Sequence, residues 1–122
     1  MSTIPKIGES EWYVMKALWE ASPLSGRDIV RAVSRYTDWS QSTILTMVRR
    51  LVKKGAIGVE QQKVNIYYPL VDEKEIARIE TNTFLNRVYK GSLNMLVKGF
   101  LEDGDISTQD LVELKKLLDD LE

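Results

Sequence analysis

The chain has 122 residues, 43% of them hydrophobic, and a formal net charge of -1, which suits one domain or a small head with a short second unit. It contains no cysteine and no histidine, so disulfides, thiolate metal sites, cysteine nucleophiles and the usual general base near neutral pH are excluded. No apolar run reaches the roughly 20 residues of a membrane-spanning helix, and residues 1–8 lack the apolar stretch of a signal peptide. We therefore expect a cytoplasmic protein that is not inserted in the membrane, is not an enzyme and uses no metal or other cofactor.

The first third of the chain predicts two helices. Apolar residues recur with helical spacing from Trp12 to Trp19, and Ala21-Ser22-Pro23 stops the pattern. Ser25 can cap a second helix, in which Asp28 completes a short capping box. A turn at residues 36–39 then separates this helix from the next.

A third helix and a β-hairpin follow. Ser40 can cap the helix, which runs to Lys54 and stops at Gly55, a residue suited to the left-handed position after a helix. The pattern then changes to alternation, so residues 57–61 and 65–68 predict two short strands joined by a polar turn. Three helices followed at once by a hairpin are typical of a winged helix-turn-helix domain. The alternative is a three-helix domain with an incidental hairpin.

Residues 72–122 predict three more helices with apolar stripes. Asp72 and Glu75 form a capping box before the first, residues 92–101 form the second, and Ser107 can cap the third. The stripes hold more apolar surface than so short a region can bury alone, so pairing with a second copy is the simplest arrangement. The alternative is that they fold back on the head of the same chain. The candidate dimerisation residues are Ile79, Phe84, Leu85, Val88, Leu93, Leu96, Val97, Phe100, Leu114, Leu117 and Leu118.

The expected fold is mainly α with a small β-hairpin. It consists of an N-terminal winged helix-turn-helix domain over residues 1–71 and a three-helix C-terminal dimerisation region over residues 72–122. The first part has 10 Lys and Arg against 6 Asp and Glu, a balance of +4, and the second has 7 against 12, a balance of -5. The basic part is therefore the candidate for binding a polyanion, although charge alone is also compatible with chance unevenness.

The third helix has an apolar side and a polar side. Ile44, Val48 and Leu51 fall at i, i+4 and i+7 and are expected to pack on the first two helices. The opposite side carries small polar residues followed by cations, an order that suits base edges in the major groove first and phosphates further along. Gln41 can pair with adenine, and Thr46 can contact a thymine methyl group. The candidate DNA-binding residues are Gln41, Ser42, Thr43, Thr46, Arg49, Arg50 and Lys53, with Lys63 at the hairpin tip.

Two other interpretations of this polar side are open. It can be a solvated surface, or it can dock a protein; the latter is disfavoured because the side lacks an exposed aromatic anchor, and protein hot spots favour Trp, Tyr and Arg. We expect double-stranded operator DNA as the partner, read by residues 41–46 and anchored by residues 49–54. Binding through several phosphate contacts predicts an affinity that falls steeply with salt.

Three segments carry a recognisable family pattern. They are Trp39-Ser40-x-x-Thr43-Ile44-x-Thr46-Met47-Val48-x-Arg50-Leu51-x-Lys53-Lys54-Gly55, Glu11-Trp12-x-Val14-Met15 with Leu18-Trp19, and Tyr67-Tyr68-Pro69-Leu70-Val71. With them the chain resembles, over nearly its whole length, the penicillinase and methicillin-resistance repressors (BlaI/MecI) and their copper-responsive relatives, the CopY repressors. The resemblance implies a homodimer held by the C-terminal helices, with each head on one half of a palindromic operator built on TACA and TGTA in front of resistance genes.

The resemblance also bears on regulation. The copper branch senses its metal through C-terminal cysteines, and this chain has none, so copper sensing is excluded. In the β-lactam branch a membrane sensor protein triggers proteolysis in the dimerisation region, at an Asn-Phe bond in a stretch that resembles Leu96-Val97-Lys98-Gly99-Phe100. The resemblance implies cleavage between Gly99 and Phe100, with Gly99 in the place of the asparagine. The alternative for Phe100 is a core residue without a role in cleavage.

Overall fold

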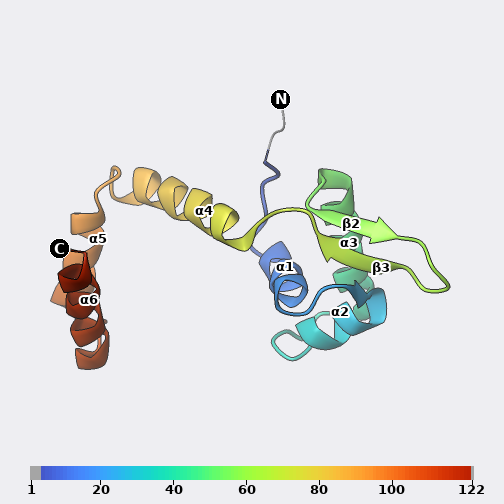
Figure 1. Cartoon of the computed structure of the whole chain (residues 1–122), viewed down its shortest axis with the longest axis horizontal. Coiled ribbons are helices and arrows are strands. Elements are labelled where there is room, and N and C mark those ends of the chain that lie inside the picture. Colours follow the sequence, from blue (N-terminus) through green and yellow to red (C-terminus); the bar gives the residue numbers. More distant parts are fainter. Residues whose placement is uncertain (1–3, 122) are drawn as a thin grey trace. The chain divides into compact units, whose positions relative to one another are not determined.

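Three helices and three short strands make up the first of two units in the computed structural model, which describes residues 4–121 (Figure 1). The Ser25 hydroxyl accepts the N–H of Asp28 and the Ser40 hydroxyl accepts the N–H of Thr43, each over 3.1 Å, so both predicted helix caps are confirmed. Gly55 ends the third helix in the left-handed region, with φ 86°. The elements are α1 (Glu11–Glu20), β1 (Leu24–Ser25), α2 (Gly26–Val33), α3 (Gln41–Lys54), β2 (Ile57–Glu60) and β3 (Ile66–Pro69).

The core of this unit lies between α1, α2, α3 and the start of β2. Ile44, Val48 and Leu51 of α3 are at most 1% exposed, as their spacing predicts. Because these aliphatic side chains meet those of α1 and α2, burial of apolar surface is the main force that holds α3 on the unit. The other buried members of the cluster are Ile7, Val14, Met15, Leu18, Ile29, Val33, Met47, Ala56, Ile57 and Ile76.

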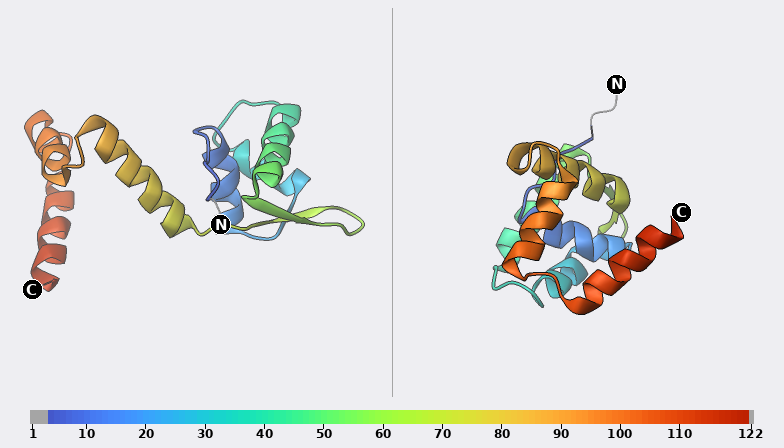
Figure 2. Two further views of the ribbon diagram at one scale, coloured as in Figure 1. Left: turned by 90° about the horizontal axis from the view of Figure 1, so that it is seen from above. Right: turned by 90° about the vertical axis from the view of Figure 1, so that its left-hand side faces the viewer.

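The sheet has three antiparallel strands in the order β1-β3-β2. The hairpin of β2 and β3 is the predicted one, and the loop that joins its strands extends beyond the three helices (Figure 2). Strand β1 was not predicted, because two residues carry no periodic pattern and pair with β3 far along the chain. Strand β2 does not alternate as predicted: Gly58 is buried because the Tyr68 ring covers it, and Val59 is exposed.

The second unit begins at Ala77, within α4 (Glu73–Val88). The first unit extends into α4 because Ile76 is 3% exposed in the core cluster, and because the Trp19 indole N–H donates to the Val71 carbonyl over 2.9 Å. This division lies five residues after the boundary expected at residue 71.

Helices α5 (Leu93–Asp103) and α6 (Thr108–Asp120) complete the second unit, so the three helices expected in this region are confirmed (Figure 1). The Ser92 and Ser107 hydroxyls accept backbone N–H groups of the first turns of α5 and α6. None of the helices formed by residues 4–121 is long and apolar enough to cross a membrane.

Candidate nucleic-acid interface

Helix α3 presents a continuous exposed side that is polar and basic. Every candidate that the sequence placed on this helix is exposed, and the first three lie in its first turn next to the Ser40 cap. No acidic residue occurs between Gln41 and Lys54. The helix therefore brings together Gln41, Ser42, Thr43, Thr46, Arg49, Arg50 and Lys53 on one accessible surface, as predicted.

Hydrogen bonds within α3 orient several of these side chains. The Thr46 hydroxyl donates to the Ser42 carbonyl over 2.8 Å and accepts from the Arg49 guanidinium over 3.2 Å. The hydroxyl of Thr46 is thus engaged on both sides, which leaves its methyl group for a partner. Arg49 is held beside Thr46, an arrangement that sequence reasoning missed. The Ser40 hydroxyl donates to that of Thr43 over 2.9 Å, so the Thr43 proton stays available for an acceptor.

Close contacts with α1 and α2 set the position of α3. A Cβ atom at Gly26 would lie 3.2 Å from Cδ2 of Leu45, so the start of α2 approaches α3 closely at a residue without a side chain. The Trp39 ring, just before the cap of α3, packs edge to face on Tyr13 of α1 with 5.2 Å between the ring centroids. The exposed side of α3 therefore belongs to a helix that is held at its beginning.

The hairpin supplies a second polar surface. Lys63 is exposed in the loop between β2 and β3, where it was predicted, and Gln61, Gln62 and Asn65 beside it are exposed as well. Sequence reasoning singled out only the lysine in this loop. Side-chain amides can donate to and accept from base edges or phosphates, so these residues extend the candidate interface.

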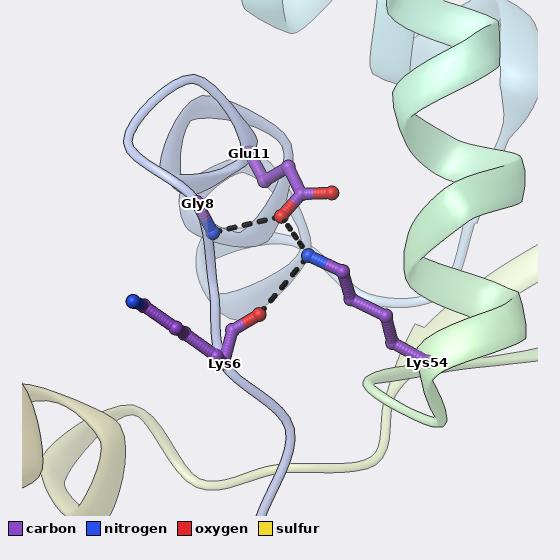
Figure 3. A network of polar contacts seen from close by, with 4 residues as sticks. All are labelled: Lys6, Gly8, Glu11 and Lys54. Carbon is purple, nitrogen blue, oxygen red and sulfur yellow. Dashed lines mark hydrogen bonds and ion pairs between the residues drawn. The ribbon is translucent and has the colours of Figure 1, made fainter.

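The last cation of α3 differs from the others. The Lys54 ammonium donates to Oε1 of Glu11 over 2.5 Å and to the Lys6 carbonyl over 3.1 Å, and the same Oε1 accepts the Gly8 N–H over 2.7 Å (Figure 3). Glu11 is 3% exposed, and its buried Oε2 accepts no hydrogen bond from residues 4–121. Sequence reasoning missed this network because its partners come from three separate segments.

Most of the candidate dimerisation residues are not buried within the chain. Leu85 is buried, and Ile79, Leu96 and Val97 are half-buried. Gly99 and Phe100 lie inside α5, with Gly99 half-buried and Phe100 44% exposed. The exposed dimerisation candidates are Phe84, Val88, Leu93, Phe100, Leu114, Leu117 and Leu118.

Within residues 4–121 there is no cluster of three acidic side chains that could hold a metal ion.

Comparison with known proteins identifies similar sequences and structures. The penicillinase repressor family model matches residues 7–120. The chain is 36% identical over 121 residues to the penicillinase repressor of Bacillus licheniformis, covering 98% of this chain and 94% of that protein. It is 38% identical over 114 residues to the methicillin resistance regulatory protein MecI of Staphylococcus aureus, covering 93% of each chain.

Two solution structures match the first part of the chain. One is the DNA-binding domain of the repressor BlaI, with a TM-score of 0.55, and the other is the monomeric form of Bacillus licheniformis BlaI in complex with the blaP half-operator, with a TM-score of 0.53. Each is 37% identical and covers 62% of this chain and 93% of the matched chain. The winged helix-turn-helix prediction for the first part of the chain is confirmed by this match.

Proposed function

Because this chain belongs to the penicillinase repressor family and is a DNA-binding transcriptional repressor, we propose that it represses a resistance operon of the β-lactamase type as a homodimer on a palindromic operator. The exposed polar side of α3, free of acidic residues between Gln41 and Lys54, is the observation that carries the proposal. The complex of the Bacillus licheniformis repressor with a half-operator supports one winged head per half-site.

Within this proposal the first two turns of α3 read bases. Gln41 pairs with an adenine, the Thr46 methyl group contacts a thymine methyl group, and Ser42 or Thr43 bonds a base or a phosphate. Arg50, Lys53 and Lys63 contact phosphates, which position the head without reading sequence. Arg49 was expected among the phosphate contacts, and its bond to Thr46 keeps it next to the base-reading residues.

A binding experiment tests the assignment of bases and phosphates. The full chain is titrated onto a labelled duplex from its own upstream region and onto a shuffled duplex, by fluorescence anisotropy. We expect Gln41→Ala to lower operator affinity by roughly five- to a hundredfold for each head, because a bidentate base contact is worth about 1–3 kcal/mol. We expect Thr46→Ala to lower operator affinity less, because it removes a methyl contact, and both variants to change shuffled-duplex binding little. Thr81→Ala in α4 is the matched control, since Thr81 makes the same 2.8 Å hydroxyl bond one turn back. If both α3 variants still preferred the operator over the shuffled duplex as strongly as wild type, the assignment of Gln41 and Thr46 to bases would be contradicted.

Two copies pair through the second unit in this proposal. Leu93, Leu117 and Leu118 are 61–63% exposed in the single chain, and exposed apolar side chains at this density on short helices favour a protein interface. Pairing covers these side chains and presents two heads to the two halves of one operator.

Release from DNA follows from proteolysis between Gly99 and Phe100 in this proposal, triggered by a membrane sensor protein that responds to a β-lactam. The bond lies inside α5, so the helix must open before a protease can bind it. Glycine in a helix interior costs about 0.5–1 kcal/mol relative to alanine, and Gly99 therefore makes opening easier. Treating the source bacterium with a β-lactam and analysing the chain by mass spectrometry tests this step; an intact chain during derepression would contradict it.

A further inference from the structure

We infer that Glu11 and Lys54 form a positioning pair that sets the orientation of α3, and that Lys54, unlike its neighbour Lys53, does not contact DNA phosphates. The inference rests on the proposed role of α3 as the base-reading helix. This inference gives Glu11 a role in positioning α3. It also removes Lys54 from residues 49–54, which the sequence predicted to anchor the helix on DNA.

The ammonium of Lys54 donates two hydrogen bonds within the protein. One goes to Oε1 of Glu11 over 2.5 Å and the other to the Lys6 carbonyl over 3.1 Å. The Lys54 side chain is 34% exposed and that of Glu11 is 4% exposed, so the carboxylate lies out of water and the ammonium of a partly exposed lysine meets it. Figure 3 shows the contacts of this ammonium. Moving Lys54 to a phosphate would leave the Glu11 carboxylate buried without its cation, which is a costly state.

The pair is poorly explained as a device for stability alone. Glu11 is the only charged residue that is buried among residues 4–121, and its Oε2 has no hydrogen-bond partner there. Packing two apolar side chains at such a place is often as stable as a buried ion pair, because the charges lose their hydration. A buried carboxylate that is paired with one cation is therefore better explained by a contact that needs direction.

The ion pair between Glu11 and Lys54 gives helix α3 a directional contact. The inner side of the helix is aliphatic at Ile44, Val48 and Leu51, and burial of aliphatic surface is non-directional, so the ion pair adds a contact whose geometry depends on where the helix sits along its own axis. The ion pair joins the last residue of α3 to the first residue of α1.

The other end of α3 is held from the same turn of α1. Tyr13 contacts Trp39, which lies just before the cap of α3, with 5.2 Å between the ring centroids. The two ends of α3 are thus tied to Glu11 and Tyr13. Base contacts need side chains within hydrogen-bond distance of base edges, so these two ties, added to the core packing of α3, favour discrimination between sequences.

Two neighbouring lysines provide a matched experiment. Lys53 is exposed and makes no ion pair with any other residue in the part of the chain that the structure describes. For Lys53→Met we expect weaker binding to operator and shuffled duplexes alike, with the slope of log K against log salt flatter by about 0.9 for each phosphate that the lysine neutralises. For Lys54→Met we expect an unchanged slope, a loss of operator affinity of about tenfold at every salt concentration and less than about twofold change on shuffled DNA.

Further variants separate positioning from general destabilisation. Lys54→Arg keeps the cation and is expected to retain operator preference. Glu11→Met removes the oxygen that accepts from Lys54, and is expected to reproduce the loss seen with Lys54→Met. Because both groups belong to one pair, the double variant is expected to lose no more than either single one. All variants are compared at a temperature at which circular dichroism shows each to be folded.

The inference is overturned if Lys54→Met flattens the salt slope as Lys53→Met does, or if Lys54→Met and Glu11→Met keep full operator preference. Failure of the proposed function has a different signature, because the wild-type chain would then bind operator and shuffled duplexes equally.

Discussion

The proposed contact of Arg50 with a phosphate gives a prediction whose size can be worked out. Arg50 is exposed on α3, and no ion pair or side-chain hydrogen bond joins it to another residue between 4 and 121. Arg50→Gln therefore removes a cation without orphaning a partner. If the arginine neutralises one phosphate, the slope of log K against log salt falls by about 0.9 per head and about 1.8 for a dimer on a palindrome.

This change of slope is large enough to measure. Between about 50 and 200 mM salt a slope of about 0.9 corresponds to a factor of roughly 3.5 in affinity, and two contacts to a factor of roughly 12. Wild type and Arg50→Gln are titrated by anisotropy at five salt concentrations, on operator and shuffled duplexes. Lys98→Gln in α5 is the control, because it makes the same change in net charge on an exposed lysine of the other unit. Equal slopes for wild type and Arg50→Gln would refute the phosphate contact.

Three further variants test the fold and the assembly. Ser40→Ala removes the cap of α3 and is expected to lower the free energy of unfolding by about 1 kcal/mol in urea titrations; an unchanged midpoint would contradict the role of the cap. Leu117→Glu is expected to yield monomers in sedimentation velocity, whereas Lys116→Glu on the same helix is expected to leave the dimer intact, and a persisting Leu117→Glu dimer would place the interface elsewhere. Gly99→Ala has room for its Cβ, since the nearest atom that residues 4–121 place beside it, apart from its own helix backbone and chain neighbours, is the Tyr89 hydroxyl at 3.9 Å. We therefore expect α5 to gain about 0.5–1 kcal/mol and proteolysis there to slow. Faster proteolysis of that variant would contradict the opening step.

Local signals in the sequence were sufficient for most of the fold. Ser25, Ser40 and Ser107 each cap a helix as predicted, because capping depends on residues only three apart. The inner side of α3 follows from helical periodicity for the same reason. The residues exposed on its outer side could be selected as a group, because an amphipathic helix leaves its polar side to solvent.

Features that depend on distant partners could not be predicted. Lys54 was grouped with the anchoring cations because a lysine at a helix end looks the same whether it faces a phosphate or a carboxylate. Its partner Glu11 lies 43 positions away and has an ordinary place in the first turn of α1. Strand β1 and the burial of Gly58 under Tyr68 also arise from pairing with β3, which no local pattern records.

The proposed pairing of two copies has a larger effect on operator affinity than any single contact of α3. A base contact contributes a discrimination of about 1–3 kcal/mol, whereas joining two heads can raise affinity by roughly a hundredfold to ten-thousandfold without a new contact. A cut in α5 can therefore release the operator while α3 stays unchanged. We expect a chain truncated after Gly99 to keep its preference for the operator sequence over a shuffled one and to lose most of its affinity. Loss of the preference together with the affinity would instead mean that the second unit takes part in base reading.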